Sequence, residues 1–172
     1  GTWDDGLLEG AWQVSGCTGD GDKALKAPAD NPAPLTGADP ICAPEDLLPQ
    51  DHDPCTESLY WHYEPGAGRI QLVNAPVSLN CCGRRSMRAV MDEGVLEVTE
   101  RDAPDDGRCK CMCDVNYSAC LSDLPQEPLE LRLMRVVTDE SLTPKLVWEG
   151  SLDLSQGYGR IDLGPSQSFE CF

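Results

Sequence analysis

From about residue 60 onward, hydrophobic and polar residues alternate along the chain with a period of two. In a β-strand, successive side chains point to opposite faces, so this alternation is typical of strands with one buried face. Clusters of Gly, Pro and Asp separate the alternating segments. These segments are residues 70–72, 77–82, 96–99, 129–133, 146–149, 152–154 and 161–163.

Two further segments bear on the fold class. Residues 7–14 can add an N-terminal strand with Trp12 and Val14 facing inward. Residues 84–91 come closest to a helical pattern, because Met87 and Met91 are four apart, but two-residue alternation fits them as well. Short strands at regular spacing, without a clear helix, predict an all-β protein built as an antiparallel β-sandwich.

The segment before the alternating region is different in composition. Residues 27–54 are rich in Ala, Asp and Pro, and proline suits neither a helix interior nor a central strand. We expect a long loop here, tethered by disulfides. The predicted organisation is one domain over residues 1–172, with an N-terminal strand and acidic Pro-rich loop in 1–59 and the β-sandwich core in 60–172.

The formal net charge of the 172-residue chain is −17, and it is unevenly distributed. The first sixty residues carry twelve acidic and two basic side chains, a net charge of −10. Nucleic acids and anionic lipid surfaces require clustered Lys and Arg, so the acidic balance argues against both as partners. No apolar run approaches twenty residues, which argues against a transmembrane protein.

Ten cysteines are compatible with five disulfides, which form and persist in oxidising compartments. We therefore expect an extracytoplasmic protein, located in the periplasm, on the outer-membrane surface or secreted, with any export signal or lipid anchor preceding Gly1. The disulfide candidates are Cys17, Cys42, Cys55, Cys81, Cys82, Cys109, Cys111, Cys113, Cys120 and Cys171.

Half of these cysteines gather in two short motifs, Cys81-Cys82 and Cys109-x-Cys111-x-Cys113. Alternation places the three thiols of the second motif on the apolar face of a strand. It also places Cys81 on the apolar face and points Cys82 outward. We expect the two motifs to meet if their strands pair.

Two main chemistries fit this cluster. Disulfides to other strands are favoured, since neighbours two apart in a strand lie at the edge of disulfide geometry. The alternative is a thiolate metal site made from Cys81, Cys82, Cys109, Cys111 and Cys113. Copper(I) suits this site better than zinc, because the spacing departs from paired zinc-binding motifs. A redox-active dithiol is the third interpretation.

The run Asn80-Cys81-Cys82-Gly83, followed by Cys109-x-Cys111-x-Cys113-Asp114-Val115-x-Tyr117, resembles a motif of small bacterial exported proteins. This largely uncharacterised group includes many predicted lipoproteins. The resemblance covers about residues 68–120. It implies an extracytoplasmic β-sandwich and carries no established activity. Its members often have a His shortly before the Asn-Cys-Cys motif, where this chain has Asn74.

Two other sets of side chains are candidates for a site. Tyr60, Trp61 and Tyr63 form an aromatic cluster, for which packing in the core is the favoured interpretation. Alternation expects one of the first two to face solvent, and exposed rings of this kind stack on sugar rings or anchor a protein partner. His52 and His62 are the only histidines, and no nucleophile or metalloprotease motif accompanies them. We therefore expect no catalytic activity.

Together these features predict an exported, disulfide-stabilised β-sandwich protein of the bacterial cell envelope. Its role would be structural or binding, with an envelope protein or a glycan as partner, and it would need no cofactor. The first alternative is a thiolate protein that binds copper(I) or zinc. The second alternative is a carbohydrate-binding module.

Overall fold

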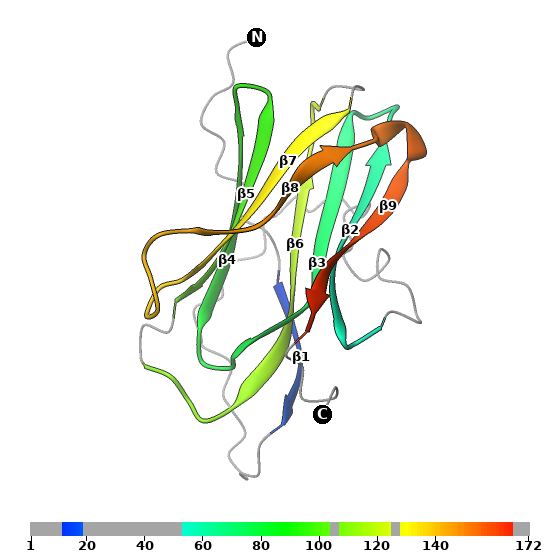
Figure 1. The fold of residues 1–172 in the computed structure, drawn as a ribbon. Coiled ribbons are helices and arrows are strands. Elements are labelled where there is room, and N and C mark those ends of the chain that lie inside the picture. The colour runs from blue at the N-terminus through cyan, green and yellow to red at the C-terminus, as the bar shows by residue number, and fades with distance from the viewer. Residues whose placement is uncertain (1–11, 19–52, 104–106, 125–127, 167–172) are drawn as a thin grey trace, which may run out of the picture.

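The computed structural model describes residues 12–18, 53–103, 107–124 and 128–166, and for 12–18 the backbone alone. These parts of the chain are almost entirely β, and they form two mostly antiparallel sheets that pack together (Figure 1). The predicted all-β sandwich is confirmed. No helix within the described ranges is long and apolar enough to cross a membrane.

The larger sheet has five strands in the order β1-β6-β3-β2-β9, and every neighbouring pair is antiparallel. Its strands are β1 (Trp12–Thr18), β2 (Thr56–Glu64), β3 (Arg69–Asn80), β6 (Met112–Leu121) and β9 (Tyr158–Pro165).

The smaller sheet has four strands in the order β4-β5-β7-β8. Its central pair, β5 and β7, is parallel, whereas its outer pairs are antiparallel. The parallel pair arises because the chain leaves this sheet after β5, runs through β6 in the larger sheet, and then returns. The strands are β4 (Arg84–Asp92), β5 (Val95–Ala103), β7 (Leu129–Val137) and β8 (Lys145–Leu152).

The hydrophobic core lies between the two sheets and follows the alternation seen in the sequence. In β4, Met87 and Ala89 are buried, whereas their neighbours in the strand are exposed, namely Ser86, Arg88 and Val90. Residues 84–91 therefore lie in a strand, which is the alternative that two-residue alternation indicates for them. In β7, Leu131 and Leu133 are buried, whereas Glu130 is exposed and Arg132 and Met134 are half-buried.

Three predicted boundaries differ from the structure. β2 begins at Thr56, before the expected start of the core at residue 60. The alternation at 152–154 is not one strand, since Leu152 ends β8 and Leu154 begins a short 3₁₀ turn, Leu154–Gln156. The N-terminal strand β1 begins at Trp12, and residues 7–11 lie outside the described residues.

Trp61 packs against a glycine on the neighbouring strand. Gly159 lies opposite Trp61 in the β2–β9 pair, and a Cβ atom on Gly159 would lie 2.5 Å from the Trp61 ring nitrogen. Real Cβ atoms do not approach a ring this closely, so a side chain at residue 159 would displace the buried indole.

We expect Gly159→Ala to lower the free energy of unfolding by about 1–3 kcal/mol, the usual cost of overpacking a well-packed core. Gly66→Ala is the matched control, because a Cβ atom there meets nothing within 4 Å. Urea unfolding monitored by tryptophan fluorescence measures both variants. Equal stability of the two variants would contradict the packing described for Trp61.

Candidate functional site

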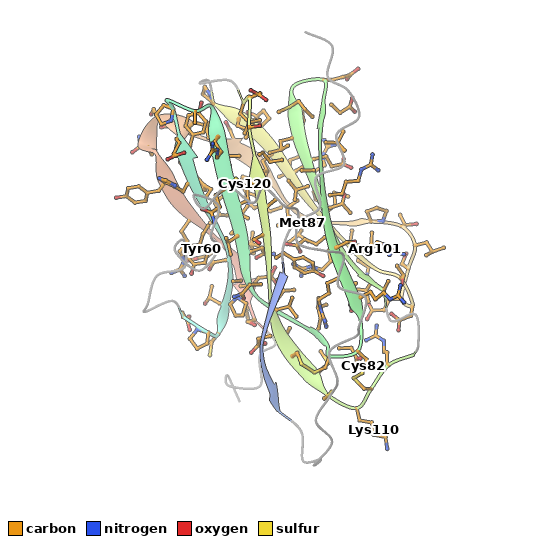
Figure 2. All side chains as sticks on the ribbon, turned by 180° about the vertical axis from the view of Figure 1, so that it is seen from behind. Tyr60, Cys82, Met87, Arg101, Lys110 and Cys120 are labelled. Atoms are coloured by element: carbon orange, nitrogen blue, oxygen red, sulfur yellow. A yellow bond between two sulfur atoms is a disulfide. The ribbon has the colours of Figure 1, made fainter. Side chains whose placement is uncertain are left out.

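The cysteine cluster lies where the chain passes between the two sheets. We call residues 81–83 the β3–β4 link and residues 104–111, of which 107–111 are described, the β5–β6 link. The first link leaves the five-stranded sheet and the second returns to it. Figure 2 shows Cys82 and Lys110 near each other at one end of the molecule, so both links lie at the same end.

Two disulfides join these links to each other and to β6. Cys81 is bonded to Cys113 with a Cα–Cα distance of 5.0 Å, and Cys82 to Cys109 with 5.7 Å. Cys113 is buried and Cys81 packs against the core, whereas Cys82 is exposed. The expected orientations of these three side chains are therefore confirmed, as is the expectation that the two motifs meet.

Asn80 holds the two links together through its side-chain amide. The amide oxygen accepts hydrogen bonds from the backbone N–H groups of Cys82, at 3.2 Å, and Cys109, at 3.1 Å. The amide nitrogen donates to the carbonyl oxygens of Cys109, at 2.6 Å, and Cys111, at 3.2 Å. An asparagine amide offers two donors and two acceptor positions, so Asn80 uses its complete hydrogen-bonding capacity on this site.

Cys111 carries a free thiol, the only one among the described residues. Its Sγ atom lies 3.2 Å from the Sγ atom of Cys109, which belongs to the Cys82–Cys109 disulfide. The chain bends at Lys110, and β6 begins only at Met112. The prediction of one strand carrying Cys109, Cys111 and Cys113 on the same buried face is therefore wrong, and Cys109 and Cys111 are half-buried.

The remaining cysteines are only partly described. Cys55 and Cys120 are disulfide-bonded. The side chains of Cys17, Cys42 and Cys171 lie outside the described residues, as does His52. His62 is exposed on the outer face of β2.

Four of the five predicted metal ligands are not available as thiolates in this oxidation state, and Cys111 is the exception. Cys81, Cys82, Cys109 and Cys113 are all in disulfides, and a disulfide sulfur does not provide the thiolate that copper(I) or zinc requires. Within the described ranges no group of three His, Cys, Asp or Glu side chains is arranged to hold a metal ion. A metal site with more than one thiolate at this cluster would require reduction of at least one bridge.

A buried ion pair between Arg85 and Asp102 contacts the backbone of the β3–β4 link. Arg85 donates to the carbonyl oxygens of Asn80 and, at 3.1 Å, Gly83, and its Nε atom lies 3.9 Å from the carboxylate of Asp102. Asp102 is fully buried, and neither carboxylate oxygen has a hydrogen-bond partner. Burial raises the pKa of Asp102, although the positive charges of Arg85 and Arg108 oppose this shift.

Asp102 also explains the glycine that follows the two adjacent cysteines. A Cβ atom on Gly83 would lie 1.7 Å from a carboxylate oxygen of Asp102, so no side chain fits there. The close approach of this backbone to a buried carboxylate fixes the position of the β3–β4 link over β5.

A second, largely buried charged cluster joins the two sheets. Arg135 in β7 donates to Glu100 in β5 and to Glu57 in β2, with 2.6 Å between the nearest atoms of each pair. Asn74 in β3 donates to the same two carboxylates, at 2.8 and 2.9 Å. These four side chains therefore cross-link two strands of each sheet.

Glu100 is the most deeply placed member of this cluster, with no exposed surface. Burial raises its pKa above the ordinary value of 4.5, even though Arg135 and the hydrogen bond from Asn74 favour the ionised form. Burial alone would lower the pKa of Arg135, but the charge of Glu100 and the hydrogen bonds that Arg135 donates to Glu57 raise it instead.

The aromatic cluster is buried, which corrects the carbohydrate-binding alternative. Tyr60, Trp61 and Tyr63 are only 3, 5 and 2% exposed. Trp61 and Tyr63 face the core, whereas Tyr60 lies on the opposite face of β2, packed with Val73 and Ala75. The expectation that one side chain faces solvent is wrong, because both faces of β2 are covered here. None of the three rings is available to stack on a sugar.

Sequence reasoning missed three residues of the site. Asn80 was noted as part of a motif, and its place directly before two cysteines was the only signal of its role. Arg85 and Asp102 lie at buried positions of β4 and β5, and a charged residue on the apolar face of an alternating strand is a detectable sign of a buried ion pair.

Comparison of the chain with protein-family models, curated proteins and solved structures finds no match. The assignment of a function therefore rests on the geometry described above.

The raised pKa of Glu100 predicts a specific pH dependence of stability. Between 4.5 and the raised value, folded Glu100 keeps a proton that the unfolded chain has released, so stability falls as pH rises. Relative to Glu100→Gln, the free energy of unfolding of the wild-type protein should fall by up to about 1.4 kcal/mol per pH unit within that interval. Above the interval the difference between the two proteins should stay constant.

Urea unfolding of both proteins at several pH values from 4.5 upward measures this difference. Glu97→Gln removes the same charge from an exposed position of β5 and separates the effect of net charge from that of burial. A wild-type protein that gains stability over Glu100→Gln as pH rises would show that the pKa of Glu100 is lowered instead.

Proposed function

We propose that this chain is an exported, disulfide-stabilised β-sandwich protein of the bacterial cell envelope with a non-enzymatic structural or binding role. The observation that carries this proposal is the pair of disulfides at the sheet-crossing links. Disulfides persist in oxidising compartments and are rare in the cytosol, so they support a location in the periplasm, on the outer-membrane surface or outside the cell.

The arrangement of the bridges fits a stabilising role. Each bridge closes a loop that contains the β4–β5 hairpin, with sequence separations of 32 and 27 residues. Closing such loops restricts the unfolded chain, which typically stabilises a protein by about 2–4 kcal/mol per bond. Such a protein presents a rigid surface to an envelope protein or a glycan.

A binding role also fits the distribution of charge. The chain carries −17 in total, and acidic surfaces favour solubility and electrostatic selection of partners with positive charge. No nucleophile and base were identified on sequence grounds, so the proposal contains no catalytic step.

The proposal predicts that the bridges are intact in protein isolated from the periplasm and that they stabilise it. We expect the double variant Cys81→Ala/Cys113→Ala to lose about 2–4 kcal/mol of unfolding free energy, because the 32-residue separation is no longer closed. Cys111→Ala is the matched control, since it removes a half-buried thiol without removing a bridge. Urea unfolding under non-reducing conditions measures both variants.

Protein isolated from the periplasm also distinguishes the disulfide-stabilised protein from the alternative thiolate metal protein. Mass spectrometry of the unreduced protein should find Cys81, Cys82, Cys109 and Cys113 in disulfides, without stoichiometric metal. Free thiols at these positions together with retained copper or zinc would contradict the proposal and favour a thiolate metal protein.

A further inference from the structure

The free thiol of Cys111 lies next to the Cys82–Cys109 disulfide. Its Sγ atom is 3.2 Å from the Sγ atom of Cys109, while Cys109 is bonded to Cys82. Separations of about 3–3.5 Å between reacting atoms are those of reactive intramolecular contacts. Disulfides exchange through attack of a thiolate on one sulfur of the bond. We propose that Cys111 and the Cys82–Cys109 bridge form a thiol–disulfide exchange centre whose external substrates are disulfides.

The internal step is balanced without any added oxidant or reductant. The Cys111 thiol releases its proton to solvent, and the resulting thiolate attacks Cys109 Sγ. A Cys109–Cys111 bond forms, the Cys82–Cys109 bond breaks, and its electron pair leaves on Cys82, which takes up a proton from solvent. The protein still contains one disulfide and one thiol at this place, but the thiol has moved from Cys111 to Cys82.

The backbone around these sulfurs is compatible with both pairings. The bend at Lys110 removes the extended geometry that would hold Cys109 and Cys111 apart in a strand. The Asn80 side chain bonds the carbonyl groups of Cys109 and Cys111 through one nitrogen, which keeps these two residues next to each other. The same amide oxygen accepts from the Cys82 N–H, so all three cysteines are positioned by a single side chain.

The buried ion pair under the β3–β4 link keeps this arrangement fixed when the disulfide changes partner. Arg85 bonds the carbonyl groups of Asn80 and Gly83 independently of any sulfur, and Asp102 lies against the backbone of Gly83. The Cys81–Cys113 bridge continues to join β6 to the same link. Release of Cys82 from its bond therefore leaves the link in place.

The exchange has a consequence for reactivity, because the two positions differ in exposure. Cys111 is half-buried, whereas Cys82 is exposed. A thiolate on Cys82 is accessible to a disulfide of another protein or of a small molecule. Its attack forms a mixed disulfide with Cys82 and releases one thiolate from the substrate.

Differential alkylation of the folded, oxidised full-length chain tests the internal step. Free thiols are alkylated with iodoacetamide at mildly alkaline pH. The protein is then denatured and reduced, the remaining thiols are labelled with N-ethylmaleimide, and the chain is digested with trypsin. Cleavage at Arg69, Arg84, Lys110 and Arg132 places Cys82 in peptide 70–84 and Cys111 in peptide 111–132. Fragment spectra then identify the cysteine that carried the first label.

We expect the first label on both Cys111 and Cys82 in the wild-type protein. Labelling of Cys82 should fall about tenfold or more in Cys111→Ser, because the attacking thiolate is gone. Met112→Ser is the matched control. It introduces the same residue one position along the chain, at an exposed side chain, and should leave the labelling of Cys82 unchanged.

The other outcomes each overturn the inference. Label on Cys111 alone, after prolonged incubation, would show a static thiol beside an inert bridge. Equal labelling of Cys82 in wild type and Cys111→Ser would show that its thiol arises without Cys111. Label on Cys81, Cys82, Cys109 and Cys113 together would show that the bridges themselves are absent, which would also contradict the proposed function.

Oxidised glutathione serves as the probe for external disulfides. We expect a glutathione adduct on peptide 70–84 of the wild-type protein, at Cys82, and its loss in Cys111→Ser. An adduct confined to Cys111 would overturn the assignment of Cys82 as the sulfur that reacts with external disulfides.

Discussion

The sandwich depends on the bonding between its two sheet-crossing links. The chain changes sheets at the β3–β4 link and again at the β5–β6 link, and the described residues of both links lie outside the strands. One buried amide, that of Asn80, bonds the N–H groups of Cys82 and Cys109 and the carbonyl groups of Cys109 and Cys111. The two disulfides then bond the β3–β4 link covalently to the β5–β6 link and to β6. Without this connection, β4 and β6 would lose the geometry at which they enter opposite sheets.

Buried charge is the second constraint on the fold. Arg135 and Glu100 of one sheet form hydrogen bonds with Glu57 and Asn74 of the other. Apolar side chains at these positions would need no hydrogen-bond partners. A buried charged cluster contributes little net stability but tolerates few alternative geometries, since any shift leaves a charge without its partner. We infer that this cluster selects one relative position of the two sheets, while the apolar core around it provides most of the stabilisation.

The alternation of residue types predicted the strands well where one face meets the core and the other meets solvent, as in β4 and β7. It predicted the side chain of Tyr60 wrongly, because alternation describes two faces and cannot tell whether the second is also covered. The cysteine count allowed hundreds of pairings. Only the register of β3 against β6, which places Leu79 opposite Cys113, brings the correct sulfurs together. That register depends on a bulge between Asn74 and Val77 that no local pattern reveals.

The parallel pairing of β5 with β7 makes assembly of the sandwich a non-local event. Val95 lies opposite Glu130, thirty-five residues later, so no hairpin can bring these two strands together. The chain passes through β6 in the other sheet before it reaches β7. Pairing between strands so far apart in the sequence slows folding. Each sulfur bond, by contrast, encloses only the local β4–β5 hairpin. Both bridges therefore involve only segments that precede β7 in the chain, and they join β6 and the β5–β6 link to the end of β3 without any contribution from the parallel pair.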